Sequence, residues 1–129
     1  MKKKILIVIA NYYEDISKGL ISSAKKELKS NIITTSIIYV PGVFEIPITI
    51  KKNIKKYDGF IALGCVIRGQ TPHFDFISKS TTDAIMLLSI EHTKPIANGI
   101  LTCLNKNQAI KRKSKGKEAA IALKSVLSQ

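Results

Sequence analysis

The sequence has no tryptophan and few of the residues that build disulfide or metal sites. It contains two cysteines and two histidines among 129 residues. Cys65 and Cys103 each lie in or at the end of an apolar run, and neither a CxxC nor an HExxH spacing occurs. Domains held together by disulfides or zinc normally carry more of these residues at closer spacing. We therefore expect reduced, buried cysteines and no metal site.

Acidic residues are also scarce, which makes the chain strongly basic. Nine Asp and Glu residues stand against 21 Lys and Arg residues, so the formal net charge is +12. Such a charge suggests nucleic-acid binding. The lysines, however, are scattered in short groups as on solvated helix faces, and they accompany 22 isoleucines. A general Lys and Ile bias explains the charge without a nucleic-acid partner, although the basic field would still attract anionic substrates.

Long hydrophobic runs are absent as well. No apolar segment approaches the roughly 20 residues that span a membrane, and the chain does not begin with a signal-peptide pattern. The sequence therefore predicts a cytoplasmic protein without a membrane partner. Hydrophobic residues still make up 45% of the chain, as in globular proteins, so we expect one domain over residues 1–129 with a buried core.

Apolar, strand-like runs alternate with helix-like segments along the whole chain. The expected strands are residues 4–10, 32–40, 60–67 and 95–101. The expected helices are residues 14–30, Val43 to about Tyr57, 75–92, a short turn at 105–111, and a last helix after the lysine-rich break at 113–117. This alternation predicts an α/β fold: a four-stranded parallel sheet with helices on both faces, in three layers.

Unusual residues follow three of the expected strands. Tyr12 follows the first, Val43-Phe44-Glu45 the second, and the segment from Arg68 to His73 the third. In parallel α/β sheets ligands bind beyond the carboxyl ends of the strands. A turn that leads from a strand into a helix also offers unpaired N–H groups to an anion. The sequence therefore predicts a binding site at this edge of the sheet.

Arginine is rare in a chain that otherwise uses lysine. Arg68 and Arg112 are the two arginines, against 19 lysines. The planar guanidinium group can contact a phosphate or carboxylate through two parallel hydrogen bonds, which an ammonium group cannot do. Both positions are candidate anion contacts, and an ordinary salt bridge is the alternative for each.

Three segments then show a specific resemblance. They are VPGVFEIP (residues 40–47), GCVIRGQTPHFD (residues 64–75) and NGILT (residues 98–102). Together they resemble the signature segments of the lumazine synthase family, and the resemblance extends from Lys4 to the final helix. It implies a flavodoxin-like fold and a transferase that makes 6,7-dimethyl-8-ribityllumazine in the penultimate step of riboflavin biosynthesis.

The implied reaction joins two small molecules, 5-amino-6-(D-ribitylamino)uracil and 3,4-dihydroxy-2-butanone 4-phosphate. An imine forms, phosphate leaves, and ring closure with loss of water completes the product. The resemblance implies no metal or organic cofactor. Because the reactants carry their own nucleophilic amine and leaving group, the protein mainly has to position them and move protons.

The resemblance also implies roles for individual residues. His73 matches the proton donor, and histidine suits this role because its ordinary pKa lies close to neutrality. The residues that match the ribitylaminouracil site are Tyr12, Val43, Phe44, Glu45, Cys65, Val66, Ile67 and Asn98. Those that match the butanone phosphate site are Gln70, Thr71 and Arg112, with Arg68, Lys115 and Glu118 in support.

Some of these residues have a simpler explanation when each is considered alone. Tyr12 could pack on the first helix, Glu45 could be an acid favoured by a helix dipole, and Thr71 could be a local turn hydroxyl. His92 lies outside the matched segments, and the dipole at a helix end explains it. The structure has to show which of the matched residues meet.

The sequence also departs from the family pattern. Tyr12 stands where Phe or Trp is more usual, Asn98 where many members have Phe, and Gln70 is larger than the residue in some members. The connection between Arg112 and Lys115-Gly116 is shorter than usual, which leaves the placement of Lys115 and Glu118 relative to Arg112 undetermined. Family members form pentameric rings with sites between subunits, and some rings close into icosahedral shells. A homo-oligomer is therefore implied, without a choice between pentamer and shell.

Three other functions remain open at this point. A non-catalytic flavin- or phosphate-binding module would retain Tyr12 and Thr71 but would not need His73. A nucleic-acid-binding protein that uses the lysine surface would show a steep salt dependence of binding. The homologous archaeal-type riboflavin synthase acts on lumazine itself and would not need Thr71 or Arg112.

Overall fold

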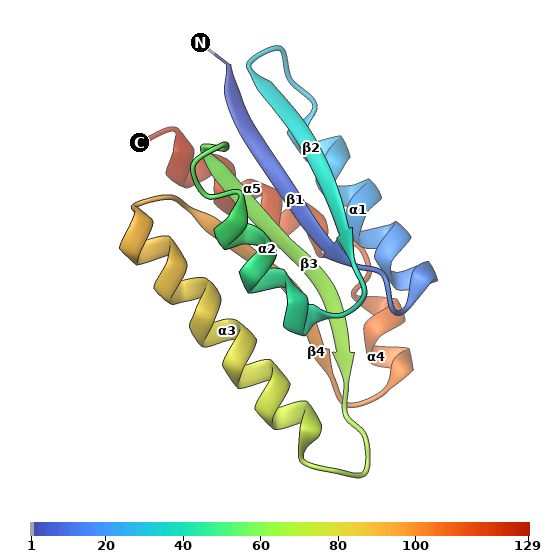
Figure 1. Cartoon of the computed structure of the whole chain (residues 1–129). Coiled ribbons are helices and arrows are strands. Elements are labelled where there is room, and N and C mark those ends of the chain that lie inside the picture. The colour runs from blue at the N-terminus through green and yellow to red at the C-terminus, as the bar shows by residue number, and fades with distance from the viewer. Residues whose placement is uncertain (1) are drawn as a thin grey trace.

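The computed structural model describes residues 2–129 and shows the predicted alternation of strands and helices. The strands are β1 (Lys3–Ala10), β2 (Ile33–Val40), β3 (Gly59–Ile67) and β4 (Ile96–Cys103). The helices are α1 (Glu14–Leu28), α2 (Ile46–Lys52), α3 (His73–His92), α4 (Lys106–Lys111) and α5 (Gly116–Leu127), with a 3-10 turn, η1 (Val43–Glu45), before α2. The α/β prediction is confirmed (Figure 1).

The four strands form one parallel sheet in the order β2-β1-β3-β4. The chain runs from β1 outward to β2 and then crosses to β3 on the other side of β1. The order therefore reverses between β1 and β3, and a crevice forms beyond the carboxyl ends of these two strands. This is the flavodoxin-like arrangement, and the crevice is its expected ligand position.

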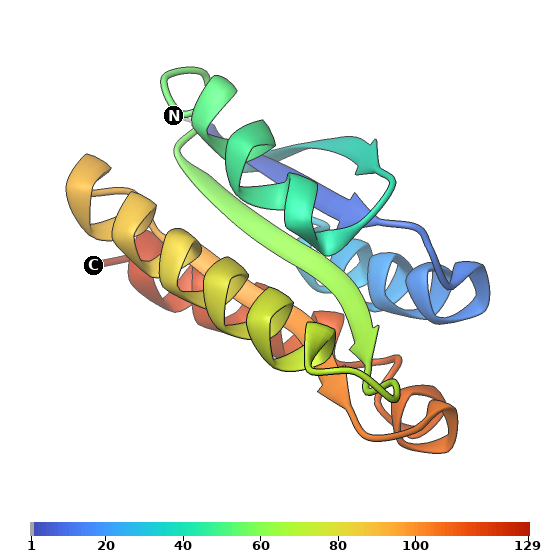
Figure 2. The same ribbon diagram turned by 60° about the horizontal axis from the view of Figure 1, so that its bottom comes forward.

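Helices cover both faces of the sheet, so the three-layer prediction is also confirmed (Figures 1 and 2). Ile5, Ile7 and Ile9 of β1 pack toward α1, α4 and α5, whereas Leu6 and Val8 pack toward α2 and α3. Because both faces of β1 are buried over residues 5–10, this part of the strand is continuously apolar instead of alternating. Ile16, Leu20, Ala24 and Leu28 recur at every fourth residue and form a buried apolar stripe on α1.

The longest helix, α3, is unusual in how little of its surface it buries. Of its 20 residues only Thr81 and Ile85 are buried. Phe76, Met86, Leu87 and Ile90 are each more than half exposed. The outer face of α3 is thus an uncovered apolar surface of a helix that packs on the sheet. No helix within residues 2–129 has both the length and the apolar character needed to cross a membrane.

Several predicted boundaries are wrong for local reasons. The segment from Val43 does not form one helix to Tyr57: η1 comes first, and α2 ends at Lys52. Pro47 lies in the first turn of α2, where its missing N–H loses no helical hydrogen bond. Strand β4 runs through Asn98, as predicted, but ends at Cys103 instead of residue 101, because its last two residues pair with the end of β3. The Asn98 side-chain oxygen accepts the Ile100 N–H at 2.9 Å on this open sheet edge.

Candidate functional site

A cleft of about 660 Å³ opens where the carboxyl ends of β1 and β3 meet, at the point where the strand order reverses. The loop after β1, the η1 turn after β2, the end of β3 and the start of α3 contribute to it. Its lining residues are Ala10, Tyr12, Tyr13, Gly42, Val43, Phe44, Glu45, Cys65, Val66, Ile67, His73 and Ile77. The structure therefore brings His73 together with all the predicted uracil-site residues except Asn98.

Strand β3 supplies one wall of the cleft through Cys65, Val66 and Ile67. Burial, and then the neighbouring Cys103 thiol, raise the pKa of Cys65 to about 12. A thiol with such a pKa carries almost no thiolate at neutral pH and is a poor nucleophile. Both cysteines are free, and no group of three or more His, Cys, Asp or Glu side chains among residues 2–129 could hold a metal ion.

The η1 turn forms the opposite wall because β3 has a glycine at the contact. A Cβ atom added to Gly64 would lie 2.8 Å from Cγ1 of the buried Val43. The absent side chain thus lets η1 approach the sheet, and this approach carries Phe44 and Glu45 to the cleft. The Glu45 carboxylate takes part in none of the ion pairs between residues 2 and 129. Glu45 is therefore available to accept hydrogen bonds from a ligand.

Two adjacent tyrosines close the cleft on the β1 side. Tyr12 is 76% exposed, whereas Tyr13 is partly buried against the core. Their ring centroids lie 4.9 Å apart at an interplanar angle of 83°, an edge-to-face contact. The Tyr13 carbonyl also accepts hydrogen bonds from the Ser17 N–H and hydroxyl, both at 2.9 Å. The Tyr12 ring is therefore exposed but supported by a fixed neighbour.

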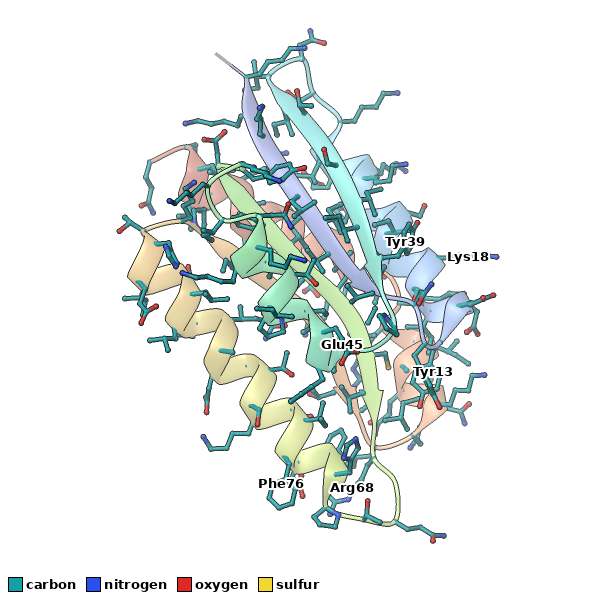
Figure 3. All side chains as sticks on the ribbon, viewed as in Figure 1. Tyr13, Lys18, Tyr39, Glu45, Arg68 and Phe76 are labelled. Carbon is teal, nitrogen blue, oxygen red and sulfur yellow. The ribbon has the colours of Figure 1, made fainter. Side chains whose placement is uncertain are left out.

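Tyr13 was not predicted as a site residue, although its position directly after Tyr12 was a usable indication. Burial raises its pKa, and the neighbouring Cys65 and Tyr12 add smaller effects in the same direction. The phenol consequently keeps its proton at neutral pH and can act as a hydrogen-bond donor. Figure 3 shows Tyr13, Glu45 and Arg68 at the end of the molecule where the strands finish.

His73 is the first residue of α3 and lines the cleft with an exposed side chain. The predicted helix start at Asp75 is therefore two residues late. The His73 N–H lies 3.4 Å from the Thr71 hydroxyl, so the turn that holds Gln70 and Thr71 adjoins the cleft. Gln70 and Thr71 themselves are exposed and do not line it.

Arg68 forms a salt bridge, the alternative to an anion contact given above. Its guanidinium lies 3.9 Å from Asp75, and both side chains are more than half exposed. The same group lies 6.0 Å from the centre of the Phe74 ring. Arg68 thus interacts along the turn and is absent from the cleft lining.

The remaining predicted phosphate residues lie in a second, smaller hollow of about 220 Å³. It is lined by Lys111, Arg112, Ser114, Lys115 and Glu118 and shares no residue with the cleft. The Arg112 guanidinium donates one hydrogen bond, to the Gln108 carbonyl at 3.1 Å. Because three cationic side chains surround a single carboxylate, the hollow favours an anion. We refer to it below as the anion hollow.

Sequence comparisons agree with the resemblance described above. A family model described as 6,7-dimethyl-8-ribityllumazine synthase matches residues 2–129. A 6,7-dimethyl-8-ribityllumazine synthase from Bartonella henselae is 44% identical over 130 residues, which cover 94% of this chain and 84% of the relative. The enzyme of the same name from Bartonella tribocorum is 42% identical over 132 residues, covering 95% and 87%. That from Agrobacterium fabrum is 41% identical over 126 residues, covering 90% and 85%.

Proposed function

Because the chain belongs to the 6,7-dimethyl-8-ribityllumazine synthase family and is a transferase of riboflavin biosynthesis, we propose how its residues divide the reaction. The cleft binds 5-amino-6-(D-ribitylamino)uracil, and the anion hollow holds the phosphate of 3,4-dihydroxy-2-butanone 4-phosphate. The reaction takes place in the cytoplasm. One observation carries the assignment: Tyr12, Glu45 and His73 meet in a single cleft at the point where the strand order reverses.

The cleft suits the uracil substrate in shape and polarity. The exposed Tyr12 ring offers a face on which the pyrimidine can stack. The main chain of Cys65, Val66 and Ile67 lies at the end of β3, where peptide groups can pair with the polar edge of the ring. Val43 and Phe44 supply the apolar wall, and the Glu45 carboxylate accepts hydrogen bonds from ribityl hydroxyls. None of these interactions requires a charged substrate.

His73 is the group that moves protons. When the substrate amine attacks the butanone carbonyl, the oxygen must gain protons before it leaves as water and the imine forms. An imidazolium donates such a proton, and the neutral imidazole takes a proton from the carbon chain as phosphate leaves. His73 lies at the N-terminus of a 20-residue helix, beside the Thr71 hydroxyl. The N-terminal partial charge favours the departing phosphate at the same place.

The anion hollow and the cleft share no residue within one chain, which has a consequence for assembly. We propose that the Arg112 and Asn98 side chains of one subunit complete the cleft of its neighbour in a ring. Gln70 and Thr71 then contact the phosphate from the His73 side, and Arg112 and Lys115 contact it from the other subunit. The uncovered apolar face of α3 supports burial against another copy of this chain.

Mixed oligomers test this arrangement directly. His73→Ala and Arg112→Ala chains are produced separately and also together from one cell, with the two chains carrying different tags. If each site combines both residues from two subunits, random mixing leaves about a quarter of the interfaces with both residues intact. Co-produced oligomers then regain about that share of activity at low butanone phosphate concentration. A site contained within one chain would give no gain on mixing, which would contradict the shared arrangement.

A second measurement separates this reaction from that of a riboflavin synthase. The protein is supplied with both substrates, and the appearance of lumazine fluorescence is followed together with released phosphate. Equal amounts of product and phosphate are expected. Supplied with lumazine alone, the protein should form no riboflavin, because His73, Thr71 and Arg112 would have no substrate phosphate or carbonyl on which to act.

A further inference from the structure

The short connection between α4 and α5 is pressed against α1. It consists of residues 112–115, folded in consecutive turns, and it carries two of the cationic side chains of the anion hollow. The Lys115 N–H donates to the Arg112 carbonyl at 3.0 Å, which links these two residues across the turn. In Figure 1 the connection runs beside α1 before α5 begins. What holds the connection against α1 therefore also determines where Arg112 and Lys115 lie.

Gly19 in α1 is an exception to what a helix interior normally contains. Glycine there is less favourable than alanine because it loses more backbone freedom on folding. A left-handed conformation would justify it, but no glycine in the described part of the chain has a positive φ. The sequence around Gly19 otherwise forms an ordinary amphipathic helix. The reason for glycine at this position must therefore be space.

The space at Gly19 is taken by Lys113. A Cβ atom on Gly19 would lie 2.9 Å from both Cβ and Cγ of Lys113 and 3.0 Å from the Lys113 carbonyl oxygen. These are backbone and near-backbone atoms, which cannot turn away as the end of a flexible side chain can. A second glycine repeats the pattern, since a Cβ on Gly116 would overlap the Leu20 carbonyl oxygen. The connection is thus fixed to α1 by close contacts on both sides of Lys115.

We infer that Gly19 is a positioning residue for the anion hollow: its missing side chain lets Lys113 lie against α1, and this contact places Arg112 and Lys115. The inference rests on the proposed function in one respect, namely that the hollow binds the substrate phosphate. Leu20, the next residue of α1, is fully buried. Helix α1 therefore cannot shift to make room, and any added atom at Gly19 must move the connection instead.

The test is Gly19→Ala, measured for both substrates. The added methyl group displaces Lys113, so the KM for butanone phosphate should rise about three- to tenfold, as for a partly lost charged contact. The KM for the uracil substrate and kcat should stay within about twofold, because the cleft does not touch Gly19. Ser22→Ala is the matched control, since it changes an exposed residue of the same helix. It should leave both KM values unchanged.

A double variant identifies the contact. Gly19→Ala combined with Lys113→Gly removes the two side-chain atoms that the methyl group would meet and leaves only the Lys113 carbonyl oxygen at 3.0 Å. The KM for butanone phosphate should therefore recover in large part relative to Gly19→Ala alone. If Gly19→Ala does not fold, a folded double variant with a KM near that of Lys113→Gly alone supports the inference equally. A double variant that also fails to fold would overturn it, because a contact other than the Lys113 side chain would then be the obstacle.

Arg112→Ala is measured in parallel to separate phosphate binding by the hollow from its positioning by Gly19. If Arg112→Ala raises the KM for butanone phosphate while Gly19→Ala does not, the hollow binds phosphate and Gly19 does not position it. If neither variant changes that KM, the phosphate role of the hollow is wrong, and the inference about Gly19 is overturned with it. A rise in the uracil KM of Gly19→Ala would indicate a general disturbance of α1 and would also overturn the inference.

Discussion

The cleft and the anion hollow differ in how the chain holds them. The cleft is walled by the central strand β3 and by η1, with Val43 and Cys65 buried beneath its surface. The hollow is made of side chains that are all exposed, on the end of a six-residue helix, the following turn and the start of α5. In our proposal, recognition of the uracil substrate is thus part of the protein core. Recognition of the phosphate depends on a surface connection and, in our proposal, on a neighbouring subunit.

The two regions also differ in charge. The cleft contains one carboxylate, Glu45, among apolar and aromatic residues. The hollow has three cations for one carboxylate. Each region matches the substrate assigned to it, since the uracil substrate is uncharged and the butanone carries a phosphate. Changes in the cleft should therefore alter the chemistry or the uracil KM, and changes in the hollow should alter the KM for butanone phosphate alone.

The largest expected difference between the regions is the reactivity of a cysteine. The Cys65 pKa is raised from 9.0 to about 12, chiefly by burial. Below its raised pKa the thiol stays protonated, and thiolate forms only as the pH rises toward that value. Alkylation of Cys65 by iodoacetamide at pH 8 should therefore be roughly a thousandfold slower than for an ordinary cysteine. Peptide mass spectrometry of time-resolved labelling measures this rate.

A matched cysteine in the hollow sharpens that comparison. Lys115→Cys introduces a thiol at an exposed position, and it should be alkylated at the ordinary rate in the same protein sample. The Cys65 rate should still climb about tenfold per pH unit between pH 9 and 11, where an ordinary thiol has levelled off. Equal labelling rates at both positions at pH 8 would show that Cys65 is accessible to solvent and forms its thiolate as readily as an exposed cysteine.

His73→Ala tests the chemical role of the cleft. Loss of a positioned acid–base group typically slows a reaction by about 10²–10⁴-fold. We expect about a hundredfold lower kcat, because the substrates' own amine and leaving group retain some reactivity. Binding of the uracil substrate, followed by equilibrium titration, should remain near that of the wild type. Weakened binding together with an unchanged rate for the bound complex would instead make His73 a binding residue.

Arg112→Ala tests the hollow in the same way. A hydrogen bond to a charged group contributes about 1.5–3 kcal/mol, so the KM for butanone phosphate should rise about ten- to a hundredfold. The uracil KM should hardly change. Arg112→Lys should recover part of the loss, since an ammonium group keeps the charge but lacks the planar fork. A normal KM for Arg112→Ala would show that Arg112 does not contact the phosphate.

The difference between the cleft and the anion hollow also explains which parts of the structure could be predicted from the sequence. The strands and the position of the cleft were predictable because buried β-branched runs and the loops that follow them have a fixed relation in a parallel sheet. The individual roles of the cleft residues came from the family resemblance. Gly64 lies inside such a run, and its closeness to Val43 follows from the fold that the run predicts. Many cleft residues are also adjacent in the sequence, so a single correctly predicted loop locates several of them at once.

The hollow could not be predicted in the same way. Whether Arg112 meets Lys115 and Glu118 depends on the path of four turn residues, and that path packs closely against Gly19, which is far away in the sequence. From the sequence alone, a glycine in a helix is expected only to destabilise that helix, and the residue that packs against it is not known. The extension of β4 to Cys103, beyond the predicted end at residue 101, has a similar cause, since pairing with β3 overrides local preference.

The smallest expected effect on KM is that of substituting Tyr13, a residue of the cleft wall. Its ring supports Tyr12 edge-to-face at 4.9 Å, and such pairs contribute about 0.5–1.5 kcal/mol beyond simple burial. Tyr13→Leu keeps an apolar residue against the core but removes the ring, so the uracil KM should rise about two- to tenfold with the butanone phosphate KM unchanged. Tyr13→Phe keeps the ring and should stay within about twofold of the wild type if support of Tyr12 is the whole role. A loss in Tyr13→Phe equal to that in Tyr13→Leu would show that the phenol itself hydrogen-bonds the substrate. A change confined to the butanone phosphate KM would place this tyrosine with the phosphate end and would contradict the division between the two regions.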